Sequence, residues 1–60
     1  MKKTTKMATV TRYNRLKGTH QHIDRRVFEN ERGEYFVRIN RTFIAVAMIE
    51  GWGWTVDIWF

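Results

Sequence analysis

The last third of the chain, residues 42–60, holds most of the large apolar side chains of a protein that has only 60 residues. Its final seven residues alternate with a period of two, which is the period of a β-strand. We expect one face of this strand to enter the core and the other to meet solvent or a partner. The residues expected on the core face are Trp54, Val56, Ile58 and Phe60. Those expected on the second face are Thr55, Asp57 and Trp59.

The length of the chain limits how much core it can build. A chain of 60 residues makes one domain and buries only about 60% of its unfolded surface. No Cys is present, so neither a disulfide nor a thiolate metal site adds stability. The 43% of apolar residues exceeds what disordered chains contain. We therefore expect a single folded domain over residues 9–60, with partner binding or homodimerisation as a further source of stability.

Positive charge is concentrated in the first half of the chain. Residues 1–26 carry eight Lys and Arg against one Asp, a net charge of +7, whereas residues 27–60 carry three against five acids, a net charge of −2. This separation produces a directional field that favours an anionic partner, most often nucleic acid. Residues 1–8 begin like a signal peptide, but no long apolar run follows, so we expect a flexible basic tail there.

The C-terminal third is the only segment apolar enough to suggest a membrane span. Glu50 and Asp57 interrupt it, and each costs about 2 to 3 kcal/mol near the centre of a bilayer. We therefore expect no membrane span. A cytoplasmic location is the expectation, because the absence of Cys is compatible with that compartment.

Two strands are predicted on either side of Gly18. Residues 9–17 contain β-branched residues and a Tyr that favour a strand, although a helix ended by Gly18 is the alternative. Residues 20–28 alternate without a cleanly apolar face, which is typical of an edge strand. Residues 30–33 place Asn at the first position of a type I turn and Gly at the fourth. We therefore expect a hairpin that joins the preceding strand to a half-buried strand at residues 35–39.

The apolar segment 42–50 has two interpretations. Its Ile and Val residues favour a strand, whereas its Ala and Met residues favour a helix that Gly51 would cap. Asn40 and Arg41 could form a tight turn before it, but Arg suits a positive φ poorly, so the alternative is that the strand at residues 35–39 runs on, bent, into residues 42–48. The sequence thus predicts a mainly β fold, a small antiparallel sheet of three to five strands, with one short helix as the alternative for this segment.

Few side chains suit catalysis or metal binding. His20 and Asp24 share a strand face with His22 but stand roughly 13 Å apart at about 3.3 Å per residue. Only the two His side chains could chelate together, and their ordinary role is that of polar surface groups. No Ser or Cys nucleophile and no Gly-rich phosphate loop is present. We expect a protein that is not an enzyme, with no metal, cofactor or small-molecule substrate.

The N-terminal half interleaves cations with an aromatic ring, and such a set can neutralise phosphates and stack on unpaired bases. Small domains also carry charge for solubility, but +7 within 26 residues exceeds that need. The leading hypothesis is therefore a non-catalytic binding module for DNA or RNA. Its expected contacts are Arg12, Tyr13, Arg15, Lys17, Arg25 and Arg26.

The Trp-rich C-terminus supports an alternative function. Three Trp side chains within the last nine residues exceed what one strand face can bury, and Trp is enriched at interface hot spots. The alternative is a small phage- or mobile-element-type protein that binds and inhibits or adapts a host protein, or that forms a homodimer through its C-terminal strand. The ordinary explanation is that the rings fill the core. The expected interface residues are Trp52, Asp57 and Trp59.

Overall fold

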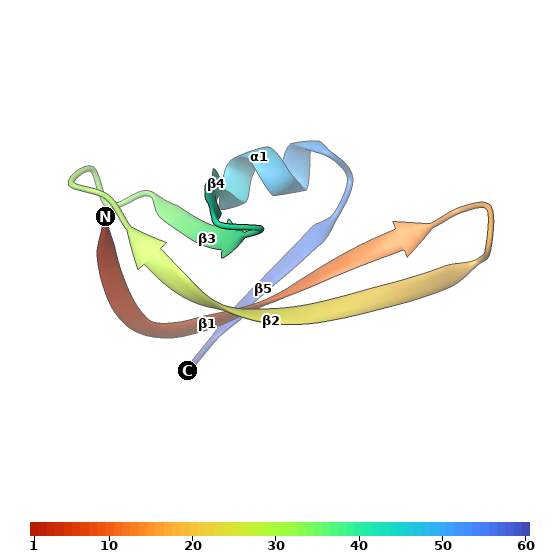
Figure 1. Cartoon of the computed structure of the whole chain (residues 1–60), viewed down its shortest axis with the longest axis horizontal. Helices are drawn as coiled ribbons and strands as arrows, with labels where there is room; N and C mark the ends of the chain where they lie inside the picture. The colour runs from red at the N-terminus through yellow and green to blue at the C-terminus, as the bar shows by residue number, and fades with distance from the viewer.

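The computed structural model describes all 60 residues as one antiparallel sheet with a short helix on one side (Figure 1). Its elements are β1 (Lys2–Asn14), β2 (Thr19–Glu29), β3 (Tyr35–Ile39), β4 (Thr42–Ala45), α1 (Val46–Gly51) and β5 (Thr55–Trp59). The sheet order is β4-β3-β2-β1-β5, so the two longest strands are both interior. The prediction of a mainly β, single-domain antiparallel fold with a short helix is confirmed.

The first strand begins at Lys2, although the sequence predicted a flexible tail over residues 1–8. That expectation is corrected, because Lys2 lies opposite Glu29 and the segment pairs with the end of β2. A bulge follows, in which the Thr4 hydroxyl donates a hydrogen bond to the Val27 carbonyl oxygen at 2.7 Å. A bulge bends the strand that carries it, and Figure 1 shows β1 turning sharply near its start.

The predicted hairpin of β2 and β3 is confirmed, with Val27 opposite Val37. In its turn the Gly33 amide donates to the Asn30 carbonyl oxygen at 3.1 Å, and Gly33 has a φ of 79°. The Asn30 side-chain oxygen also accepts from the Arg32 amide at 3.0 Å. Both sequence signals therefore act as expected: the Asn side chain holds the turn, and the Gly adopts the positive φ.

Residues 42–50 are part strand and part helix, since β4 passes directly into α1. The turn that precedes β4 is tight, with Asn40 at φ 50°, Arg41 at φ 66°, and Ile39 opposite Thr42. Two consecutive positive φ values are typical of a type I′ turn. Arg41 thus occupies a position that its side chain disfavours, because the pairing of β3 with β4 requires a turn of only two residues.

The core lies between the sheet and α1. Its five fully buried side chains are Ala8, Val10, Val27, Val37 and Ile49. They come from the three interior strands and from the one buried residue of the helix. The largest buried contribution therefore comes from the middle of the sheet and not from the C-terminal strand.

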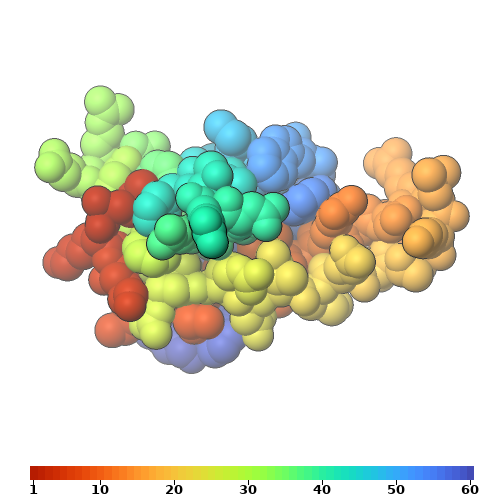
Figure 2. Space-filling model, in the orientation of Figure 1, coloured from red at the N-terminus to blue at the C-terminus, as the bar shows by residue number.

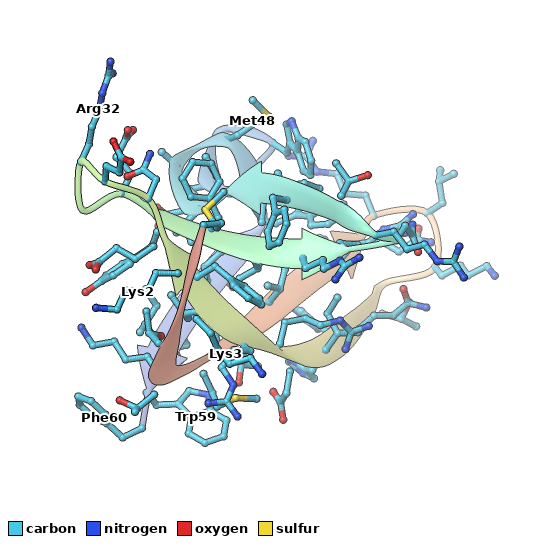
Figure 3. The ribbon with its side chains drawn as sticks, turned by 60° about the vertical axis from the view of Figure 1, so that its left-hand side comes forward. Lys2, Lys3, Arg32, Met48, Trp59 and Phe60 are labelled. Carbon is cyan, nitrogen blue, oxygen red and sulfur yellow. The ribbon has the colours of Figure 1, made fainter.

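The expected C-terminal core face is only partly buried. Trp54 and Val56 pack against the core, as predicted, but Ile58 is 39% exposed and Phe60 is 85% exposed. These two are corrected to surface positions, because β5 is an edge strand and the six-residue α1, about 9 Å long, does not reach its end. Figure 3 shows Phe60 far from the helix at that end of the sheet.

Candidate nucleic-acid interface

The β1–β2 hairpin extends beyond the rest of the sheet. β1 pairs with β5 only as far as Thr11, and β2 pairs with β3 only from Val27 onward. Residues 12–21, which we call the arm, therefore have no third strand beside them. Figure 1 shows the arm projecting to the right of the sheet, and Figure 2 shows it standing clear of the remaining surface. The molecule is accordingly elongated, with extents of 38 × 21 × 18 Å.

The tip of the arm is held by a side chain and by a glycine. Asn14 lies opposite Thr19, and its side-chain oxygen accepts hydrogen bonds from the amides of Leu16 at 3.1 Å and Lys17 at 3.3 Å. Gly18 closes the loop with a φ of 63°, which other residues rarely adopt. The tip is thus a defined turn in which Leu16 is 99% exposed.

The arm is basic, with three cations and no acid. The first 23 residues of the chain contain no Asp or Glu, and Arg12, Arg15 and Lys17 lie within the arm. The nearest acid along the chain is Asp24, whose carboxylate accepts a hydrogen bond from the Thr9 hydroxyl at 2.7 Å. A projecting element with cations and no carboxylate concentrates positive potential at the end of the molecule.

The two sides of the arm carry different groups. Residues alternate between the faces of a strand, so Arg12 lies on the same side as α1 and the core, with its guanidinium 5.5 Å from the Trp54 ring centre. Tyr13 lies on the opposite side, where its ring is 4.8 Å from the His20 ring. The Thr11 hydroxyl lies 2.9 Å from His22 Nδ1 on that same side. These contacts fix the base of the arm and leave Tyr13 49% exposed.

The structure divides the predicted nucleic-acid contacts. Arg12, Tyr13, Arg15 and Lys17 are brought together in the arm, whereas Arg25 and Arg26 lie further back on β2 and on opposite faces. Arg26 Nη1 donates to the Thr4 carbonyl oxygen at 3.1 Å, and Arg25 Nη1 donates to the Asp24 carbonyl oxygen at 2.8 Å.

Sequence reasoning missed Leu16 at the tip. The Asn14 and Gly18 turn residues on either side were the signal that could have found it.

The predicted protein interface is divided as well. Trp59 is 43% exposed and its indole Nε1 donates to the Thr9 hydroxyl oxygen at 2.8 Å. Asp57 lies opposite Thr9 in the register, so these residues share one face of the sheet. Trp52 is 49% exposed but follows α1, where its ring contacts Trp54 at 5.2 Å. Asp57 and Trp59 therefore form one surface, and Trp52 belongs to another.

No other group of residues forms a recognisable chemical site. The His20 and His22 rings stack at 6.4 Å, and no cluster of three or more His, Cys, Asp or Glu is placed to hold a metal ion. One surface hollow lies beside the β2–β3 turn and has only Met1 as an apolar lining residue. Small-molecule sites are usually lined by apolar side chains. No helix has the length and apolarity needed to cross a membrane.

Comparisons with protein families, curated proteins and solved structures each found no match to this chain. The features of this chain that bear on its function are therefore the arm, the exposed end of β5 and the charge distribution.

Proposed function

We propose that this protein is a non-catalytic nucleic-acid-binding module whose arm contacts phosphates. The observation that carries the proposal is a projecting two-stranded ribbon with Arg12, Arg15 and Lys17 and without any acid. Duplex nucleic acid carries one negative charge per about 1.7 Å of axis, so a compact group of cations meets several phosphates at once. Binding releases counterions, which gives the affinity a strong dependence on salt.

The size of the salt effect follows from the number of cations. If the three arm cations each neutralise one phosphate, the logarithm of the binding constant falls with the logarithm of salt concentration with a slope of about −2.7. Exposed side chains on a fixed turn reach the phosphates without rearrangement of the fold. Tyr13 adds an aromatic surface beside them, 49% exposed, on which an unpaired base can stack.

The first prediction compares two double variants, each of which removes two positive charges, in a salt titration of binding to labelled DNA and RNA. Arg15→Gln with Lys17→Gln should lower the affinity and reduce the slope by about two, because two fewer phosphates are neutralised. The matched control, Lys2→Gln with Arg32→Gln, removes the same charge at the opposite end of the molecule, near the N-terminus and the β2–β3 turn (Figures 1 and 3). The control should retain most of the slope. Equal decreases in affinity for the two double variants would mean that net charge, and not the arm, drives binding.

A second candidate function is recognition of a protein through the end of β5, and the exposure of Trp59 favours it. This ring is 43% exposed on an edge strand, whose free backbone groups and nearby Asp57 suit a partner. The expected partner is a host protein or a second copy of the chain.

The second prediction is that Trp59→Ala abolishes capture of a protein partner in a pull-down from nuclease-treated lysate while the chain stays folded by circular dichroism. Trp59→Phe, which keeps a ring but removes the hydrogen bond to Thr9, should retain part of the capture. If nuclease treatment of the lysate abolishes capture by the unsubstituted protein, the partner is held through nucleic acid and this candidate function is rejected.

A further inference from the structure

We infer that the arm enters the major groove of B-form duplex DNA with Leu16 at the floor of the groove. This inference rests on the proposed function and names the ligand of the same site. The arm is a two-stranded ribbon that no other strand or helix flanks. The major groove, about 12 Å wide, admits a two-stranded β-ribbon, whereas the minor groove is about 6 Å wide.

The reach of the arm matches the depth of that groove. The last pairing with β5 is at Thr11, and the strand continues through Asn14 before the turn. Three residues at about 3.3 Å each extend the ribbon by roughly 10 Å, and the four-residue turn adds to this. The groove is about 8.5 Å deep. The tip can therefore reach the edges of the base pairs while the sheet stays outside the DNA.

The chemistry of the tip fits the groove floor. Leu16 is 99% exposed, and the bonds from its amide and the Lys17 amide to Asn14 fix the loop that presents it. The apolar group on the floor of the major groove is the C5-methyl of thymine, which apolar side chains contact. Arg15 and Lys17 flank Leu16 along the chain, and their length lets them reach phosphates or guanine edges.

The sides of the arm also fit between two phosphate backbones. Arg12 lies on one side, and Tyr13 and His20 lie on the other. No carboxylate occurs in the arm to repel either backbone. A duplex of RNA has a deep, narrow major groove that side chains cannot read. The same arm should therefore bind duplex DNA more tightly than duplex RNA of the same sequence.

The first test measures binding by fluorescence anisotropy with a labelled A·T duplex at low salt. We expect affinity for the DNA duplex to exceed that for the RNA duplex by about tenfold. The major-groove ligand methyl green should displace the protein, and the minor-groove ligand netropsin should not. Displacement by netropsin alone, or equal affinity for DNA and RNA duplexes, would overturn the inference.

The second test pairs a variant with a change in the DNA. Replacing thymine by uracil removes only the methyl group and should weaken binding of the unsubstituted protein about fourfold, the effect of one buried methyl group. Leu16→Ala should bind both duplexes equally, whereas Leu16→Met should keep the preference. Identical thymine-to-uracil ratios for the unsubstituted protein and Leu16→Ala would overturn the inference.

The two proposals fail in different ways. Absence of salt-dependent binding to any DNA or RNA would reject the proposed function and this inference together. A normal salt slope with no preference for duplex DNA, or with no effect of the thymine methyl, would reject the groove assignment alone.

Discussion

At the scale of single residues, turn chemistry separates what the sequence predicts from what it does not. The Asn30 to Gly33 turn was predicted because each residue acts locally, Asn by its side chain and Gly by its φ of 79°. The turn at Asn40 and Arg41 was disfavoured because Arg avoids positive φ. In the structure Arg41 nevertheless has a φ of 66°, since the pairing of β3 with β4 fixes the length of the loop. Tertiary pairing therefore overrides a local preference there.

Replacing Arg41 by Gly should stabilise the protein, because Gly adopts this φ without strain. Relief of a strained φ contributes about 1 kcal/mol to the free energy of unfolding, which raises Tm by about 4 to 8 °C in a domain of this size. Thermal unfolding followed by circular dichroism measures it. Arg32→Gly is the control, because Arg32 has no positive φ and should become less stable instead. A lower Tm for Arg41→Gly would show that the Arg side chain contributes more than its backbone costs.

At the scale of elements, alternation predicted the strands but not the way in which they are covered. The periodic C-terminal strand was expected to supply the core, yet Phe60 is 85% exposed because α1 ends before reaching it. Alternation also placed strands on both sides of Gly18. It could not show that they pair with each other past the limits of β3 and β5, because the length of a neighbouring strand is not encoded in the strand itself. The arm, and Leu16 at its tip, were missed for that reason.

The contribution of α1 depends on one side chain, Ile49, which is 0% exposed. Ile49→Ala should lower the free energy of unfolding by about 2 to 5 kcal/mol through the cavity that it leaves. The core of a domain of this size contributes only about 3 to 5 kcal/mol to the free energy of unfolding. A urea titration at room temperature should therefore show that the variant is largely unfolded before urea is added. The neighbouring Met48 is 56% exposed and points away from the sheet (Figure 3), so Met48→Ala should change stability by less than about 0.5 kcal/mol. Similar destabilisation of both variants would contradict this account of the core.

At the scale of the whole molecule, the fold and the candidate site occupy separate parts of the chain. None of residues 12–21 is buried, and all five core side chains lie outside the arm. Three of the eight cations of residues 1–26 lie at the projecting end, which carries no acid, whereas Lys2 lies at the other end of the molecule. The sequence predicted that positive charge is concentrated in the N-terminal half of the chain. Where that charge lies in the molecule depends on the register of β1 with β2, which only the structure shows.

This separation predicts that the arm can be removed while the fold is kept. Joining Thr11 to His22, which face each other in the register, through an Asn-Gly turn should keep the β-sheet spectrum and a cooperative thermal transition. The deletion removes the stacking of Arg12 on Trp54, which stabilises the fold by about 0.5 to 1 kcal/mol. Binding to nucleic acid at low salt should disappear, because the three arm cations are gone. A shortened chain that folds and still binds DNA or RNA with the original salt slope would move the site to the cations of the sheet, among them Arg25 and Arg26.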